Sequence, residues 1–265
     1  MADFTVSLKP AHPDGATVIA QERQRSSIPV DELSQHLLAP TFLNRQKRVL
    51  DALQKDPVFS KANQANLSRP DRYKLGLARG KRTRQLVDKH GWDEEDQVMA
   101  EYLIDDVSPY HLHNSMFVTT VREQANDAQR AYWLPKIESW QIIGSYAQTE
   151  LGHGSNVRGL ECEARWDPKS KEFVIHSPTL TASKWWNGTM GRTANHAIVV
   201  AQLMIPEPGT GSAAKYKSYG PHTFIVQIRD MKTHQPPSTI KVGDIGPKYG
   251  YASMDNGYML FDNHR

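Results

Sequence analysis

The stretch Tyr146-Ala-Gln-Thr-Glu-Leu-Gly-His-Gly-Ser-Asn156 marks the point at which the pattern of this 265-residue sequence changes. Upstream of it, apolar residues recur at helical spacing; downstream, alternation and β-branched residues predominate. Within the stretch, polar side chains surround two glycines: Gln148, Thr149, Ser155 and Asn156 around Gly152 and Gly154. Hydrogen-bonding groups on a backbone that can approach a ligand closely suit a binding loop. Glycines also shape plain hairpins and bulges, so from these residues alone both interpretations stay open.

Upstream of the stretch, residues 31–140 are predicted to form an all-helical domain. Thr41, Ser68 and Asp93 are placed to cap the starts of helices, and Gly91 to cap an end. With these boundaries, helices are expected at about 42–54, 69–90, 94–105, 108–124 and 126–139.

Residues 1–30 mix prolines, polar residues and isolated apolar residues without a helical or strand period. They are expected to be an N-terminal extension that is extended or poorly ordered.

Downstream of the stretch, residues 141–265 are predicted to form a β domain. Strand candidates rich in β-branched and aromatic residues lie at about 160–166, 173–176, 194–203, 222–228 and 258–261. Asp167-Pro168 and Asp255-Asn-Gly257 are typical of tight turns between strands. Short strands with frequent turns favour an antiparallel barrel or sandwich, and helices followed by strands favour the α+β class.

A second stretch, Lys184-Trp-Trp-Asn-Gly188, combines two indoles with a glycine. Indole rings suit stacking on a flat aromatic ring, and Gly188 would let the backbone come within hydrogen-bonding reach of a ring edge. Tryptophans are also common core residues. Because consecutive strand residues face opposite sides, at most one of Trp185 and Trp186 is expected to line a given pocket.

Several classes of function are not supported by the sequence. Gly152-His-Gly154 lacks the later glycine and the following helix of a dinucleotide fingerprint, and no His/Cys/carboxylate set has metal-ligand spacing. No apolar run approaches the roughly 20 residues of a membrane span. Cys162, the single cysteine, excludes an intramolecular disulfide.

Charge gives no argument for nucleic acid as a partner. The net charge is +3 and the pI ≈ 8.8, which is mildly basic. The basic segment 69–89 is followed by the acidic segment 93–106, so the two adjacent helices are expected to pair their charges on solvated faces. No aromatic residues are interleaved with the basic ones in the way that single-stranded nucleic acid requires.

Taken together, five blocks in order resemble the peroxisomal acyl-CoA oxidases: 146–156, 157–161, 184–188, 243–250 and 254–265. The resemblance implies FAD as cofactor, a fatty acyl-CoA substrate and O₂ as electron acceptor. The products in that family are a trans-2-enoyl-CoA and H₂O₂, formed in fatty acid β-oxidation. It also implies a peroxisomal location and a homodimer at full length.

Carried over by position, the resemblance assigns roles to four residues of the two stretches. Thr149 and Gly188 match FAD contacts of the family, and Trp186 matches a tryptophan near the isoalloxazine ring. Ser155 occupies the position that touches the pantetheine region of the substrate in the related acyl-CoA dehydrogenases. No metal ligand is implied.

The family's catalytic base is a glutamate of a C-terminal helical domain, and no residue of this sequence matches it. The resemblance therefore implies a chain comprising the helical and middle β domains only, with the base and the C-terminal helical domains beyond Arg265. Such a chain is expected to be inactive alone. Two alternatives stay open: an acyl-CoA dehydrogenase that passes electrons to a carrier protein, and a non-catalytic module for binding acyl-CoA or FAD or for assembly.

Overall fold

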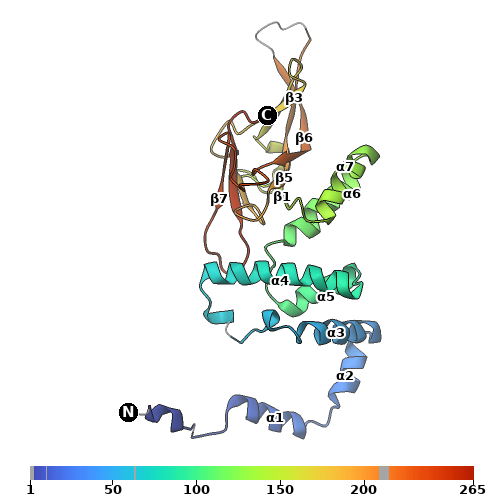
Figure 1. Ribbon diagram of the computed structural model, residues 1–265, viewed down its shortest axis with the longest axis vertical. Helices are drawn as coiled ribbons and strands as arrows, with labels where there is room; N and C mark the ends of the chain where they lie inside the picture. The colour runs from blue at the N-terminus through green and yellow to red at the C-terminus, as the bar shows by residue number, and fades with distance from the viewer. Residues whose placement is uncertain (1–2, 10, 63, 209–214) are drawn as a thin grey trace. The chain divides into compact units, whose positions relative to one another are not determined.

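The computed structural model describes residues 3–9, 11–62, 64–208 and 215–265. The chain divides into two compact units, 1–52 and 53–265. The first unit is helical, with η1 (Phe4–Ser7), α1 (Gly15–Arg25), α2 (Val30–Leu37) and α3 (Pro40–Leu53), whose last residue crosses the boundary (Figure 1).

Two expectations for this first unit are wrong. The segment 1–30 is not extended or poorly ordered throughout, because α1 forms within it. Asp14 caps that helix by accepting a hydrogen bond of 2.9 Å from the Thr17 N–H, and the helix contains good helix formers. Thr41 does not cap α3, which begins one residue earlier at Pro40, where the fixed φ of proline suits a first helical turn.

In the second unit, the helices end where their caps predict. Ser68 caps α4 (Arg69–His90), which stops at Gly91 with φ of 63°, and Asp93 caps α5 (Glu94–Ile104). The region predicted over 108–124 contains a π-helical segment, η4 (His113–Phe117), continued by α6 (Val118–Gln124). α7 (Asp127–Glu138) follows, and short 3₁₀ turns complete the helical part: η2 (Pro57–Phe59) and η3 (Gln64–Asn66).

The strands of the second unit form a five-stranded and a three-stranded sheet among the described residues (Figure 1). The first contains β1 (Gly144–Ala147), β2 (Glu163–Asp167), β3 (Glu172–His176), β5 (His196–Pro206) and β6 (Tyr216–Gln227). The second contains β4 (Lys184–Asn187), β7 (Ile240–Asp244) and β8 (Gly257–Phe261). Helices followed by a β-sheet region confirm the predicted α+β class.

Strand pairing is antiparallel except at β5, which has three partners in the larger sheet. β1 and β2 both run parallel to it, one after the other along its length, while β6 pairs with it antiparallel. Parallel neighbours require long crossovers, and here the chain travels through other strands between β1 and β5. Local alternation cannot reveal such pairing, so the sheet is mixed where an antiparallel one was expected.

The main core lies between the two sheets. Small alanines from the larger sheet face larger side chains of the other: Ala147, Ala164, Ala197 and Ala201 with Ile240, Met259 and Phe261. A second core packs α6 and α7 on β5 through Val121, Ile137 and Ile198. Burial of these side chains stabilises the arrangement by about 1.5–3 kcal/mol for each large one.

The hairpin predicted around Asp255-Asn-Gly257 is wrong. Tyr251 is not in a strand, and β8 pairs instead with β4 and β7. The Asp255 carboxylate accepts hydrogen bonds of 2.7 Å from the backbone N–H groups of Arg192 and Thr193. These long-range contacts outweigh the local turn propensity.

The basic helix α4 pairs its arginines mainly with carboxylates outside α5. Arg82 pairs with Asp56, and Arg72 with Asp106 at 3.2 Å. Arg69 donates to both oxygens of Asp244 at 2.7 Å. Because Asp106 belongs to the acidic segment 93–106, the expected pairing of the basic and acidic segments forms in part. Other arginines of α4 instead join it to Asp56 and to β7. The chain changes from helix to strand between Glu138 and Gly144. The predicted division into an N-terminal extension, a helical domain and a β domain, with boundaries at residues 30 and 140, stays a prediction.

Candidate functional site

The two stretches singled out in the sequence lie side by side in the second unit. The Trp185 N–H donates to the Thr149 carbonyl at 3.0 Å, and Asn187 Nδ2 donates to the Tyr146 carbonyl at 2.9 Å. The Gly188 carbonyl accepts from Ser145 Oγ at 2.7 Å. The segment around Thr149 and the segment that carries Gly188 are therefore tied together at three points.

Ser155 lies apart from this pairing. It is exposed, on the loop before a short 3₁₀ turn, η5 (Val157–Gly159). In the described part of the chain, no contact joins its side chain to the paired stretches, and no hydrogen bond engages the Thr149 hydroxyl either. Both hydroxyls are therefore available to a ligand.

The two tryptophans of β4 are both substantially exposed, Trp185 at 38% and Trp186 at 51%. The register shifts between Trp185 and Asn187, and Trp186 adopts φ of 68°, so the strand is irregular here. That at most one of the two indoles lines a given pocket stays a prediction. A bulky residue in the left-handed region costs about 1–2 kcal/mol and needs outside support. Asn256 supplies support by donating from Nδ2 to the Trp186 carbonyl at 2.6 Å.

Gly188 is buried, and its missing side chain points into the protein. A Cβ there would lie 3.0 Å from Met254 Sδ and 3.2 Å from Leu112 Cδ1. From the sequence, glycine was expected at this position so that the backbone could approach a ring edge. The direction in which a side chain would point is instead filled by the protein itself. Close packing against Met254 and Leu112 leaves little room for a side chain here.

Four buried oxygens near Gly188 have no hydrogen-bond partner among the described residues: Asn187 Oδ1, Thr189 Oγ1, Asp255 Oδ1 and Asn256 Oδ1. They belong to the segments 187–189 and 255–256, at the end of the β4–β8 pairing where Asn187 stands opposite Gly257. Buried oxygens without a protein partner are the usual sign of ordered water or a bound polar group. Sequence reasoning missed them, although Asp255 and Asn256 lie within the last of the five blocks.

Burial is the main influence on Asp255 and raises the pKa of its carboxyl, against the hydrogen bonds from Thr193 and Arg192. The Arg229 guanidinium holds the same turn by donating to the carbonyls of Ala194, Met190 and Gly191. Asp255 thus has a structural task in shaping the turn that follows Gly188.

A buried ion pair connects the two stretches. Lys184 Nζ lies 2.9 Å from Glu150 Oε1, and both side chains are fully buried. Lys184 also donates to the carbonyls of Val200 at 2.6 Å and Gln148 at 3.3 Å. The Glu150 carboxylate accepts from the backbone N–H groups of Glu161 at 2.8 Å and Cys162 at 3.0 Å.

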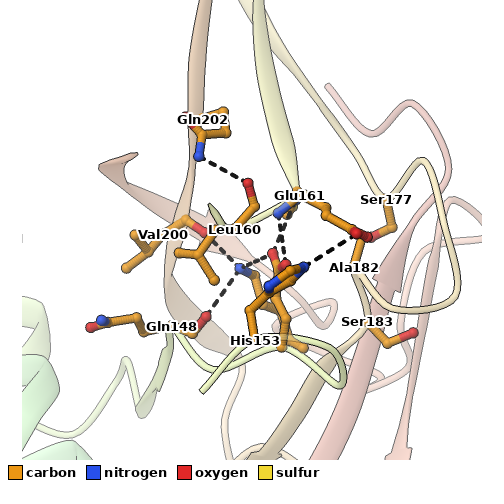
Figure 2. A network of polar contacts seen from close by, with 12 residues as sticks. Gln148, His153, Leu160, Glu161, Ser177, Ala182, Ser183, Val200 and Gln202 are labelled. Atoms are coloured by element: carbon orange, nitrogen blue, oxygen red, sulfur yellow. Dashed lines mark hydrogen bonds and ion pairs between the residues drawn. The ribbon is translucent and has the colours of Figure 1, made fainter. Parts of the chain in front are cut away.

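Glu161 belongs to a second polar group beside this pair (Figure 2). Its carboxylate lies 3.2 Å from His153 Nε2 and accepts a hydrogen bond of 2.8 Å from Thr181 Oγ1. Thr179 Oγ1 donates to the same oxygen. The hydrogen bonds from Thr179, Thr181 and His153 lower the pKa of Glu161. Glu150 and Glu161 are therefore both engaged as acceptors.

Other reactive groups do not converge on these stretches. Burial raises the pKa of the Cys162 thiol to about 11, which leaves it protonated and a poor nucleophile. Among the residues described, no group of three or more metal-binding side chains is found, and no helix is long and apolar enough to cross a membrane.

A cavity of about 930 Å³ lies elsewhere, between α6–α7 and the β5–β6 face. Trp133, Phe224 and Gln227 are among its lining residues, and none of the four predicted site residues reaches it. Its size does not make it the site, because the paired stretches carry the exposed indoles and the unpartnered oxygens.

Comparisons with known proteins support the resemblance to acyl-CoA oxidases that the sequence blocks suggested. Residues 29–143 match the family profile described as Acyl-coenzyme A oxidase N-terminal. Peroxisomal acyl-coenzyme A oxidase 1 of Homo sapiens is 41% identical over 249 residues, which is 92% of this chain and 36% of the human protein.

Solved structures give the same result. Acyl-CoA oxidase 1 of Arabidopsis thaliana is 40% identical with a TM-score of 0.82, over 92% of this chain and 36% of that one. Acyl-CoA oxidase-2 of Caenorhabditis elegans, bound with FAD, ascaroside-CoA and ATP, is 36% identical with a TM-score of 0.79, over 92% and 37% of the two chains. The chain thus spans about a third of the length of these relatives. It belongs to the acyl-CoA oxidase family.

Proposed function

We propose that this chain carries the flavin-edge part of an FAD-dependent acyl-CoA oxidase of peroxisomal fatty acid β-oxidation. The overall reaction converts a fatty acyl-CoA and O₂ to a trans-2-enoyl-CoA and H₂O₂. The observation that carries the proposal is the pairing of the Thr149 segment with β4, beside a half-exposed indole and a group of unpartnered buried oxygens.

The chemical character of the residues at this site suits a flavin. The Trp186 indole is half exposed and suits stacking on a flat ring, and the free Thr149 hydroxyl suits a hydrogen bond to a ring edge. Gly188 contributes the close packing that keeps its backbone beside Thr149. When bound, FAD supplies the two-electron acceptor for the reaction. Ser155, exposed on the neighbouring loop, is proposed to touch the substrate away from the reacting carbons.

The base that removes a proton from the substrate is proposed to come from outside the described residues. Glu150 is bonded to Lys184 and two backbone N–H groups, and Glu161 is bonded to His153 and two threonines. Asp255 is buried and holds a turn through Arg192 and Thr193. For each of these three carboxylates, acting as the base would mean breaking hydrogen bonds that it makes within the protein, which costs free energy.

The test is to mix the 265-residue chain with FAD and a saturated acyl-CoA, and to measure bound flavin and released H₂O₂. We expect flavin to bind without turnover. Turnover comparable to that of a complete oxidase would contradict the claim that the base lies elsewhere.

The dehydrogenase alternative differs in its electron acceptor. In a full-length relative carrying this segment, oxygen consumption with substrate and no added acceptor supports the oxidase. Activity that depends on an added electron carrier would support the dehydrogenase. Flavin binding with neither activity would support a non-catalytic module. The homodimer at full length and the peroxisomal location remain parts of this proposal.

A further inference from the structure

The Glu150–Lys184 pair has a geometry that its burial alone does not explain. Every hydrogen-bonding site of the ammonium is used, because Lys184 donates to Glu150 and to the carbonyls of Gln148 and Val200. Both carboxylate oxygens of Glu150 accept backbone N–H groups as well. The ammonium thus uses all three of its donors, and the carboxylate accepts three hydrogen bonds, so the polar groups of the pair are engaged within the protein.

The network joins backbone segments that are far apart in the sequence. Lys184 connects β4 to the Gln148 carbonyl and to β5 at Val200. Glu150 connects the loop after β1 to the segment at Glu161 and Cys162 that leads into β2. In Figure 2, Gln148, Glu161 and Val200 from these segments lie around one group of polar contacts.

The pair lies directly beside the candidate flavin contacts. Glu150 and Lys184 form an isolated β-bridge with each other. The next backbone bond along the chains joins the Trp185 N–H to the Thr149 carbonyl at 3.0 Å. A second joins the Leu151 N–H to the Ser183 carbonyl at 2.8 Å, on the other side of the bridge. The bridge thus sets which residue of one stretch stands opposite which residue of the other.

A buried ion pair contributes less to stability than apolar residues of similar volume often would, since both charges lose their hydration. In some proteins such a pair fixes register instead. We propose that Glu150 and Lys184 form a positioning clamp that holds Thr149 in register with Trp186 and Gly188. This proposal rests on the proposed function only for the claim that flavin is what those residues contact. Glu150 and Lys184 act through their neighbours and touch no substrate.

The experiment compares three variants of the 265-residue chain with the unchanged chain. Lys184→Met removes the cation while keeping an unbranched side chain. Glu150→Gln with Lys184→Met removes both charges, avoids leaving one buried alone, and keeps the fold accessible if the single variant does not fold. Arg79→Met is the matched control. Arg79 is 2% exposed and donates to the carbonyls of Val58 and Ser60, away from the clamp.

Two quantities are measured for each variant: hydrogen exchange of peptides covering 146–151 and 183–188, and the dissociation constant for FAD. The clamp predicts at least a tenfold rise in exchange at these peptides in both clamp variants, with the β5–β6 pairing still protected. It also predicts at least a tenfold weaker binding of FAD. Arg79→Met should loosen residues around 58–64 and leave both site peptides and FAD binding unchanged.

Four results decide the proposal. Unchanged exchange at 146–151 and 183–188 in the double variant overturns it. A uniform rise over all peptides also overturns it, because that is what a merely structural pair would give. Normal FAD affinity in a clamp variant of a chain that binds FAD overturns it too. A local rise in a chain that never binds FAD supports the clamp and counts against the proposed function.

Discussion

A Cβ at Gly188 would make tight contacts with two neighbours, 3.0 Å from Met254 Sδ and 3.2 Å from Leu112 Cδ1. Both are ends of flexible side chains, so an added methyl can be accommodated only by repacking. Gly188→Ala should therefore lower the free energy of unfolding by about 1–3 kcal/mol. Urea unfolding measures it.

Gly154→Ala is the matched control for Gly188, since a Cβ there meets nothing within 4 Å. Alanine restricts the unfolded chain, so the control should be neutral or stabilising by less than about 1 kcal/mol. Equal losses in the two variants would show that local packing at Gly188 is not the cause.

Two buried histidines predict how stability depends on pH. Burial lowers the pKa of His113 to about 4, and burial together with Lys136 lowers that of His196 to about 4. Unfolded histidine has a pKa of about 6.5, so between pH 6.5 and pH 4 the unfolded state binds more protons. Stability is therefore complete above about pH 6.5 and falls as pH drops, by about 2 kcal/mol for each residue at pH 5.

His113→Gln tests this assignment. His113 Nδ1 accepts from the Gly144 N–H at 3.1 Å, a bond that a glutamine oxygen can replace without a titrating group. The fall in the free energy of unfolding between pH 6.5 and pH 5 should be smaller in this variant by about 2 kcal/mol. An unchanged slope would mean that other groups carry the acid sensitivity.

Cys162 should be unreactive in the folded protein. Its pKa of about 11 leaves very little thiolate at pH 8, and its side chain is fully buried. Labelling with a disulfide reagent at pH 8 should proceed only on unfolding. Rapid labelling without denaturant would contradict the burial of the segment that Glu150 holds.

At the scale of the element, β4 is held in an unusual conformation by its partners. The left-handed Trp186 is followed by a left-handed Thr189, with φ of 68° and 65°, and β-branched residues rarely adopt such angles. Two contacts hold this conformation: the hydrogen bond from Asn256 to the Trp186 carbonyl, and the pairing of β4 with β8 with its shift in register. Strain of this kind is concentrated at functional sites.

Trp186→Asn tests the strain, because asparagine tolerates the left-handed region. The relief should offset the lost contact with Tyr251, so the free energy of unfolding should change by less than about 1 kcal/mol. Trp185→Asn has no strain to relieve and loses the stacking on Tyr258, so it should cost about 1–2 kcal/mol. A greater loss at Trp186 than at Trp185 would show that β4 is not strained.

At the scale of the whole second unit, α4 is joined to the β sheets by polar contacts. The Asp244 side chain is only 7% exposed. Both of its carboxylate oxygens accept hydrogen bonds from Arg69, and one of them also accepts a hydrogen bond of 3.1 Å from Arg192. Burial would raise the pKa of Asp244, but the hydrogen bonds from Arg69, Gly246 and Arg192 lower it overall. Tyr73 adds a bond of 2.9 Å to Thr193.

Asp244→Asn should cost about 2 kcal/mol in unfolding free energy, because Arg69 then keeps its charge beside a neutral amide. Glu138→Gln is the control. Its pair with Arg122 is about half exposed on both sides and should contribute less than about 1 kcal/mol. Similar losses in both variants would contradict the view that α4 is locked to β7.

The parts of the fold that are set locally could be predicted from the sequence. Ser68, Gly91 and Asp93 act within one helical turn, so their caps are visible in the neighbouring residues. The parallel pairing of β1 with β5 depends on residues about fifty positions apart and leaves no local pattern.

The same division holds for the candidate site. The two stretches are visible as motifs, and the resemblance assigns their residues. The bulge at Trp186, the bond from Asn256 and the Glu150–Lys184 pair arise from tertiary contacts, which no spacing in the sequence encodes.

The central claim is that a flavin lies against Trp186, beside Thr149 and Gly188. Titrating the 265-residue chain with FAD, and comparing Trp186→Ala with Trp185→Ala, tests it most directly. We predict saturable binding that is at least tenfold weaker in Trp186→Ala and changed by less than about threefold in Trp185→Ala, since stacking on a tryptophan contributes about 1–3 kcal/mol. Equal dissociation constants for Trp186→Ala and the unchanged chain, or no saturable binding by the unchanged chain, would contradict it.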